Sequence, residues 1–128
     1  MRVLTLVDKV GSAIWRLGED VKKELDFLDI KVLSLHPKRP SLEEIQAIEE
    51  FQPDILDIQY WKSGEKLFEL LPKYKDIPAV LSHHNPYDLM AKDWSHYKKN
   101  IVSNLTQKRV LRDAEVVTLS VNVKKFKW

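Results

Sequence analysis

Short apolar runs alternate along the chain with longer segments in which apolar residues recur every three or four positions. The short runs are rich in β-branched residues and are typical of strands, whereas the longer spacing is typical of helices that bury one face. The predicted strands are residues 2–7, 30–35, 55–60, 79–82 and 116–121, and the predicted helices are residues 13–25, 42–51, the segment around 67–71, and a long helix centred on Ile101, Val102, Leu105, Val110 and Leu111.

Residues typical of helix ends mark these boundaries. Ser12 can cap the first helix, and Ser41 with Glu44 forms the S-x-x-E capping box of the second. Pro53 ends the second helix and Pro72 closes the third. Strands alternating with helices predict one α/β domain over residues 1–128, a Rossmann-like open parallel sheet of about five strands with helices on both faces.

Ligands of such sheets bind at the carboxyl ends of the strands. The first loop at that edge holds Gly11 and Ser12 ahead of a helix, so its backbone N–H groups could receive an anion or a sugar hydroxyl. Neither a G-x-G-x-x-G nor a Walker pattern is present, because Gly18 lies inside the predicted helix. This disfavours dinucleotide and ordinary nucleoside triphosphate binding. A plain turn that needs a small residue is the alternative.

The richest candidate chemistry follows the fourth predicted strand, where His83, His84 and Asn85 stand together. Consecutive strand residues point to opposite sides, so the two histidines make a poor metal clamp and no metal is expected. A neutral imidazole at a strand end can exchange hydrogen bonds with a substrate hydroxyl. We expect His84 to face the cleft and His83 to point into the fold. The alternative is one core histidine beside one solvated histidine.

Two large aromatic residues, Tyr60 and Trp61, end the third predicted strand. Their rings could stack on a sugar or a base, or could cap the core and form a domain interface. Exposed aromatic rings of this kind would also support self-association or partner binding.

Composition narrows the class of protein. A chain of 128 residues, 44% of them hydrophobic, suffices for one core, and no apolar run approaches the roughly 18 residues of a membrane span. The strand-like start at Val3 predicts no signal peptide, and the absence of cysteine excludes thiol catalysis and disulfides. We therefore expect a cytoplasmic protein.

The two halves of the chain differ in charge. Residues 1–61 hold 8 basic and 12 acidic side chains, and residues 62–128 hold 13 basic and 7 acidic ones. The basic half combines aromatic and cationic residues, namely Trp94, Tyr97, Lys98, Lys99, Lys108, Arg109 and Arg112. This composition predicts contact with the anionic inner face of a membrane, with Trp94 as anchor, or else a solvated helix face. No nucleic-acid partner is expected, because no reading helix or stacking platform accompanies it.

Several sequence segments, taken in their order along the chain, resemble those of the N-terminal domain of two-domain retaining glycosyltransferases. This class includes glycogen synthase and sucrose synthase. The segments are R-V-L-T-L-V, a glycine-bearing loop opening a helix, Q-P-D-I-L-D-I-Q-Y, P-A-V-L-S-H-H-N and R-D-A-E-V-V-T-L-S. His84 falls on a histidine of the family. Two departures are a single Gly11 in place of paired glycines, and Gln59 or Tyr60 in place of a histidine.

The resemblance implies an acceptor-side domain of the two-domain glycosyltransferase fold, with a sugar nucleotide as co-substrate and no other cofactor. His84 would contact the transferred sugar in catalysis, and Gly11, Ser12, Tyr60, Trp61 and Asn85 would bind substrate. The sugar nucleotide would be bound mainly by a C-terminal domain that this sequence lacks, so the isolated chain is expected to be inactive. The alternative is a stand-alone binding or regulatory domain of flavodoxin-like architecture.

Overall fold

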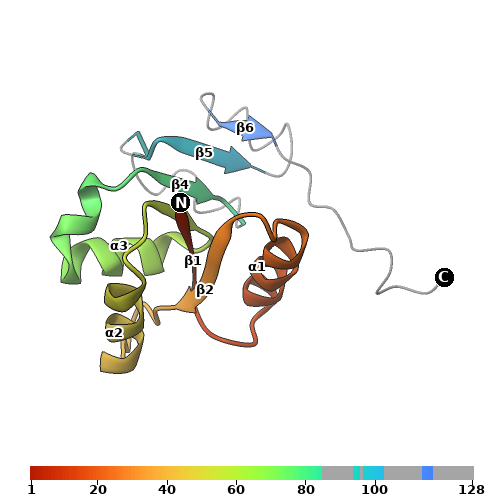
Figure 1. Cartoon of the computed structure of the whole chain (residues 1–128). Coiled ribbons are helices and arrows are strands. Elements are labelled where there is room, and N and C mark those ends of the chain that lie inside the picture. The colour runs from red at the N-terminus through yellow and green to blue at the C-terminus, as the bar shows by residue number, and fades with distance from the viewer. Residues whose placement is uncertain (85–93, 96, 103–113, 117–128) are drawn as a thin grey trace.

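The computed structural model describes residues 1–84, 94–95, 97–102 and 114–116, and its centre is an open, all-parallel β-sheet (Figure 1). In these residues the sheet has six strands in the order β2-β1-β3-β4-β5-β6. The strands are β1 (Arg2–Val7), β2 (Asp29–Ser34), β3 (Ile55–Ile58), β4 (Ala79–Ser82), β5 (Lys99–Val102) and β6 (Glu115–Val116). The helices are α1 (Ala13–Glu24), α2 (Leu42–Phe51), α3 (Trp61–Leu70) and the short 3-10 helix η1 (Pro72–Asp76). The predicted α/β class and parallel sheet are confirmed.

Helices cover both faces of the sheet. A Cβ built on Gly18 of α1 would lie 3.2 Å from Thr5, and one built on Gly64 of α3 would lie 3.0 Å from Ile58. Thr5 pairs in register with Asp57, the neighbour of Ile58, so Thr5 and Ile58 face opposite sides of the sheet. Helices α1 and α3 therefore pack on opposite faces.

The larger core lies on the α3 face, where alternate strand residues are buried. It consists of Leu4, Leu6, Leu35, Ile48, Leu56, Ile58, Leu67, Phe68, Tyr74, Ala79, Leu81, Trp94 and Tyr97. Trp94 is only 2% exposed, and its ring lies edge-on to Trp61 at 5.5 Å and to His83 at 4.9 Å. The prediction that Trp94 anchors the chain on a membrane is therefore wrong, because its indole is buried in the core.

A second correction concerns Ile101 and Val102, which were predicted to lie in a helix. They belong to β5, where Ile101 pairs with Ser82 of β4. A short apolar run with β-branched residues fits a buried strand as well as a buried helix, and Asn100 stabilises the strand by donating from Nδ2 to the Trp94 carbonyl at 3.0 Å. Residues 103–113 of that predicted helix lie outside the described residues. Of the predicted strand 116–121, only residue 116 is described, in β6.

The helix boundaries follow the capping residues for α1 and α2 but not for α3. Ser12 and Ser41 are the N-caps of α1 and α2, and Ser41 and Glu44 form the predicted capping box. Helix α3 begins at Trp61, three residues before Gly64, so Gly64 is inside the helix and packs against the sheet. Strand β3 accordingly ends at Ile58 rather than Tyr60.

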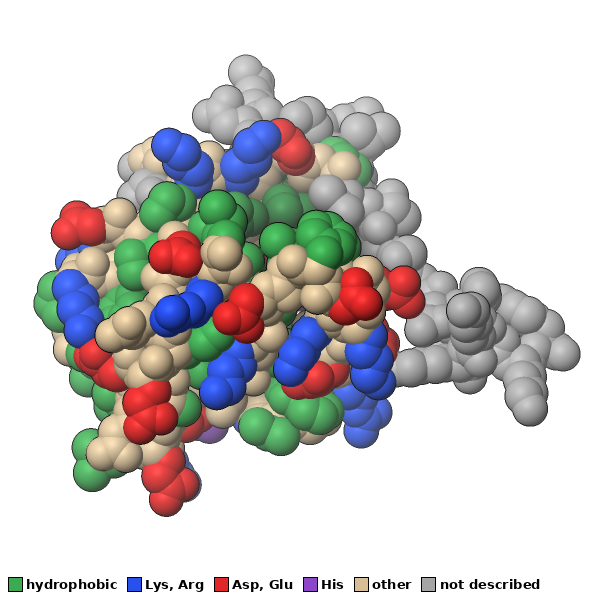
Figure 2. Space-filling model, viewed as in Figure 1, with side chains coloured by type: hydrophobic (Ala, Val, Ile, Leu, Met, Phe, Trp, Pro, Cys, Tyr) green, Lys and Arg blue, Asp and Glu red, His purple; other side chains and the backbone are tan. Residues whose placement is uncertain are grey.

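Charged side chains of both signs are interspersed over the face seen in Figure 2, with hydrophobic side chains between them. None of the described helices combines the length and the apolar character needed to cross a membrane. The strand order β2-β1-β3-β4-β5 is the doubly wound order in which the crevice between β1 and β3 opens at the carboxyl ends of the strands. That edge is where the candidate residues lie.

Candidate functional site

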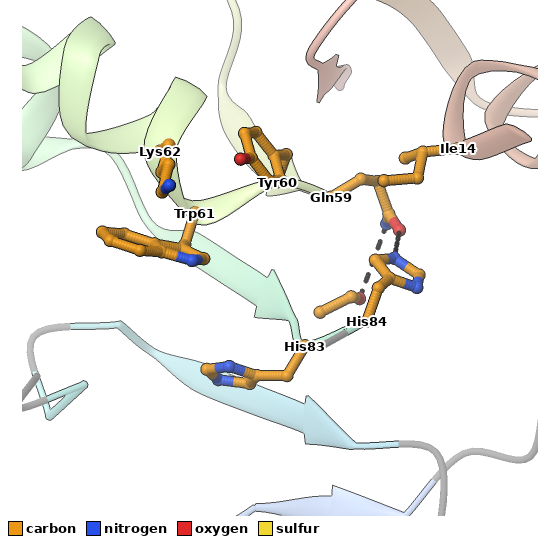
Figure 3. Close-up of a pocket in the computed structure, with 8 residues that line it drawn as sticks. Ile14, Gln59, Tyr60, Trp61, Lys62, His83 and His84 are labelled. Atoms are coloured by element: carbon orange, nitrogen blue, oxygen red, sulfur yellow. Dashed lines mark hydrogen bonds between the residues drawn. The ribbon is translucent and has the colours of Figure 1, made fainter. Parts of the chain in front are cut away.

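A pocket of about 230 Å³ opens at the carboxyl ends of β3 and β4 (Figure 3). It is lined by Ile14, Gln59, Tyr60, Trp61, Lys62, Ser82, His83 and His84. The lining comes from the junction of β3 and α3 at Tyr60, from the end of β4, and from α1, which supplies Ile14. The pocket thus joins the two histidines and the two aromatic residues that the sequence singled out separately.

The rings of His83 and His84 diverge, as the alternation of strand side chains predicted. His83 is 5% exposed, and its Nε2 lies 2.9 Å from Oδ1 of Asn100, with the ring against Trp94. His84 is half-buried and turns toward Gln59 on the α1 face of the sheet (Figure 3). His83 therefore packs in the core and only borders the pocket, whereas His84 faces it.

A chain of hydrogen bonds runs across the sheet to His84. Thr5 Oγ1 donates to Oδ2 of Asp57 at 3.0 Å, and Gln59 Nε2 donates to Oδ1 of the same carboxylate at 2.8 Å. On the other side of the Gln59 amide, Oε1 lies 2.8 Å from Nε2 of His84. The four side chains come from β1, β3 and the ends of β3 and β4, so the sheet register holds them in line.

This chain determines which nitrogen of His84 carries the proton. An ionised carboxylate only accepts hydrogen bonds, so Asp57 requires the amino group of Gln59 and leaves the amide oxygen facing His84. Nε2 of His84 must then be the N–H donor, and Nδ1 is the acceptor. Among the described residues, no group bonds Nδ1, which points away from Gln59 in Figure 3.

Burial shifts both titratable groups of the chain. Burial lowers the pKa of His84, and the nearby His83 lowers it further, which favours the neutral ring. Burial raises the pKa of Asp57, while the hydrogen bonds from Gln59 and Thr5 oppose that rise. A neutral imidazole with one unbonded acceptor nitrogen is suited to receive a hydrogen bond from a hydroxyl group.

The aromatic wall of the pocket is anchored in the core. Trp61 is half-buried, and its ring packs edge-on against Trp94. Nζ of Lys62 lies 5.5 Å from the centre of the Trp61 ring, a cation–π distance. Tyr60 is the N-cap of α3 and is also half-buried. The ring of Trp61 thus combines a core contact with an edge of the pocket.

Gly11 and Ser12 lie at the next strand end, and neither is among the residues that line this pocket. Gly11 has φ of 87°, a left-handed conformation that favours glycine. Oγ of Ser12 accepts from the Trp15 N–H at 3.1 Å and donates to Asp8 at 3.0 Å, so the hydroxyl serves the helix cap. Asn85 lies outside the described residues.

Three residues were not predicted as part of the site, namely Thr5, Asp57 and Ile14. The sequence signal for Asp57 is a carboxylate within an otherwise apolar strand, since such a residue must find donors when buried. Gln59 appeared only as a departure from a family pattern, although it contacts His84 directly.

Within the described residues, no three His, Asp or Glu side chains come together in a way that could hold a metal ion. Comparison with known proteins adds no assignment. The chain matches no protein-family model, no curated protein and no solved structure, so its function has to be inferred from the pocket itself.

Proposed function

We propose that this chain is the acceptor-side half of a sugar-nucleotide-dependent glycosyltransferase, and that the pocket at His84 holds a sugar. The observation that carries the proposal is the acceptor nitrogen Nδ1 of His84, oriented by Gln59 and Asp57 at the carboxyl end of β4. A sugar hydroxyl is the matching donor. The resemblance of several sequence segments, in their order, to those of glycosyltransferases supports the same assignment.

The remaining walls of the pocket suit a sugar ring. Tyr60 and Trp61 present aromatic surface, on which the C–H face of a pyranose packs, while Ser82 adds a hydroxyl to the lining. The volume of about 230 Å³ lies below the roughly 300–1,000 Å³ of pockets for drug-sized ligands. A single sugar therefore fits this pocket better than a whole sugar nucleotide.

In this proposal the nucleotide part of the donor is bound by a second domain or a partner protein facing the same strand-end edge. The reaction transfers a hexosyl group from the sugar nucleotide to an acceptor hydroxyl in the cleft between the two halves. The described chain supplies one wall of that cleft. Alignment of the two reactants provides much of the rate in such reactions, so the chain alone should not turn over sugar nucleotides.

The strand order also favours a second candidate, a stand-alone binding domain. The order β2-β1-β3-β4-β5 is that of flavodoxin-like folds, which bind small molecules without a second domain. The two candidates differ in ligand. A flavodoxin-like domain would bind a flavin or another aromatic cofactor at the β1/β3 crevice, whereas the glycosyltransferase half would bind a neutral sugar beside His84.

The test is a titration of the isolated chain with glucose, mannose and riboflavin 5′-phosphate, followed by amide and imidazole resonances. A neutral sugar should shift resonances at the ends of β3 and β4, and His84→Ala should weaken its binding by about tenfold, the scale of one hydrogen bond to a well-ordered group. Gln46→Ala, at an exposed position of α2 that lines neither cavity, is the control and should leave binding unchanged.

Three results would overturn the proposal. The first is addition of sugar without any shift of the protein resonances at the pocket. The second is equal sugar binding by the wild type and His84→Ala, and the third is binding of the flavin but of neither sugar. Turnover of UDP-glucose or GDP-mannose by the isolated chain at ordinary enzyme rates would contradict the need for a second half.

A further inference from the structure

A second cavity, of about 410 Å³, lies beside the His84 pocket at the same strand-end edge. We call it the basic pocket, and it is lined by Asp8, Lys9, His36, Pro37, Lys38, Arg39 and Tyr60. All of these residues except Tyr60, which follows β3, come from the loops after β1 and β2. Tyr60 lines both cavities, so the two are neighbours that share one aromatic wall.

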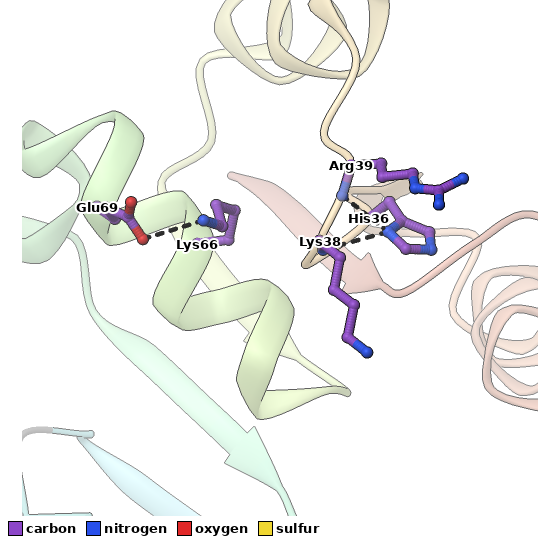
Figure 4. Close-up of polar contacts among 5 residues, drawn as sticks. All are labelled: His36, Lys38, Arg39, Lys66 and Glu69. Atoms are coloured by element: carbon purple, nitrogen blue, oxygen red, sulfur yellow. Dashed lines mark hydrogen bonds and ion pairs between the residues drawn. The ribbon is translucent and has the colours of Figure 1, made fainter.

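The cations of the basic pocket are not neutralised by the described residues. Lys9, Lys38 and Arg39 form no ion pair in that part of the chain, whereas Lys66 is paired with Glu69 at 3.1 Å (Figure 4). The one carboxylate of the lining, Asp8, accepts a hydrogen bond from Ser12. Three cations against one carboxylate give the cavity an excess of positive charge.

The loop that carries Lys38 and Arg39 is held in place from within. Nδ1 of His36 accepts from the backbone N–H groups of Lys38 at 3.2 Å and Arg39 at 3.1 Å (Figure 4). With Nδ1 as acceptor, the neutral ring carries its proton on Nε2. His36 thus holds this loop through Nδ1 and is itself part of the lining of the basic pocket.

Glu44 ties the base of this loop to α2. Its Oε2 accepts from Oγ of Ser34 at 2.8 Å and from the His36 N–H at 3.2 Å, and its Oε1 accepts from the Ser41 N–H at 2.9 Å. The acceptors near the loop are thus occupied by internal hydrogen bonds. Apart from Asp8, the charged groups that line the cavity are the cations Lys9, Lys38 and Arg39, an excess of positive charge that favours an anion.

We infer that the basic pocket binds a phosphate group, and that the ligand spanning the two cavities is a phosphorylated sugar or polyol. A phosphate matches the pocket because Lys38 and Arg39 both line it, and the guanidinium fork of an arginine can bind a phosphate through two N–H groups. The sugar part of the ligand rests on the proposed function of the His84 pocket, whereas the phosphate part stands on the basic pocket alone.

The test compares glucose 6-phosphate, glucose and inorganic phosphate as ligands of the isolated chain by calorimetry. Glucose 6-phosphate should bind at least about tenfold more tightly than glucose, the scale of one charge-assisted contact. This advantage should shrink as salt is added. Vesicles containing a phosphoinositide, run in parallel, show whether the phosphorylated polyol is instead a lipid headgroup.

The test variant is the double substitution of Lys38→Gln and Arg39→Gln. The control is the double substitution of Lys22→Gln and Lys23→Gln in the last turn of α1, which removes the same charge from another exposed site. The test variant should bind glucose 6-phosphate no more tightly than glucose, with its affinity for glucose unchanged. The control variant should keep the wild-type affinity for both ligands. Equal affinity for the two sugars in the wild type, or equal losses in both variants, would overturn the inference.

The two proposals fail in different ways. Inorganic phosphate bound by the wild type and not by the Lys38 and Arg39 variant, without any binding of glucose, would retain the phosphate site and overturn the sugar pocket. Binding of glucose beside His84, with equal affinity for glucose 6-phosphate, would retain the sugar pocket and overturn the phosphate site.

Discussion

Gln59 is the residue on which the orientation of His84 depends. Its amide is asymmetric, and the carboxylate of Asp57 selects which end faces the imidazole. Thr5 occupies the second oxygen of that carboxylate, so Asp57 cannot easily turn away. Asp57 and Gln59 are therefore positioning residues, and their effect should be measurable on the ring of His84 without any ligand.

The tautomer of His84 provides the first prediction. Long-range ¹H–¹⁵N spectra should show the proton on Nε2 in the wild type, because Gln59 accepts there. Asp57→Asn replaces a carboxylate, which only accepts hydrogen bonds, with an amide that can also donate. The Gln59 amide can then rotate by half a turn, and a measurable fraction of His84 should carry the proton on Nδ1. A wild-type ring with its proton mainly on Nδ1, or an unchanged tautomer in Asp57→Asn, would contradict this chain of contacts.

The pH dependence of stability provides a second prediction. Burial lowers the pKa of His84 in the folded chain below its ordinary value of 6.5. As the pH falls through 6.5, His84 is therefore protonated in the unfolded chain while it stays neutral in the folded chain. The free energy of unfolding should therefore fall from about pH 7.5 to about pH 5.5, and His84→Gln should lose less over the same interval in urea denaturation.

Asp57 acts in the opposite direction. Its folded pKa is raised above 3.8, so the folded chain binds a proton before the unfolded chain does, and acidification between the two pKa values favours folding. Asp57→Asn removes this contribution. A curve of unfolding free energy against pH that is identical in wild type, His84→Gln and Asp57→Asn would show that neither group is perturbed.

Among the helices, α1 and α3 each contact the sheet through a glycine, and the space around the glycine of α3 is the tighter of the two. Gly64 lies among buried residues of α3, and a Cβ there would meet two carbons of the fully buried Ile58 at 3.0 Å. Gly18 is the one buried residue of α1, and its nearest contacts are the side-chain ends of Thr5 and Val32 at 3.2–3.4 Å. Helix α1 can move outward more easily than α3.

This difference predicts unequal effects of the same substitution. Alanine in a helix interior gains about 1 kcal/mol over glycine, and overpacking a rigid core costs about 1–3 kcal/mol. Gly64→Ala should therefore lower the free energy of unfolding by about 1–2 kcal/mol, and Gly18→Ala should change it by less than about 1 kcal/mol in either direction. Denaturant titration measures both, and equal losses would show that the two helices are equally confined.

The elements also show what the sequence could predict. The capping box of Ser41 and Glu44 is a local interaction, and α2 begins where it predicts. Strand β5 depends on pairing with β4 and on the contacts of Asn100 with His83 and Trp94, which are not local in sequence. An apolar run of this length does not distinguish a strand from a helix until its neighbour is known.

For the molecule as a whole, the parallel sheet and the strand-end edge followed from the alternation of elements along the chain. The opposite orientation of His83 and His84 followed from the two-residue period of a strand. The chain of Thr5, Asp57 and Gln59 could not be predicted, because it joins residues as far as 52 positions apart through the sheet register. Local patterns thus predicted where the pocket lies, and tertiary contacts determined how its histidine is held.

The central position of β1 has a consequence for synthesis of the protein. Strand β1 pairs with β2 on one side and with β3 on the other, and the contact of Arg2 with Asp54 again joins residues 52 positions apart. At about 5–20 residues per second, a ribosome needs roughly 3–10 s to add the segment that completes this pairing. Until β3 is available, β1 lacks its partner on one side, and an apolar strand with an open edge is the kind of segment that aggregates.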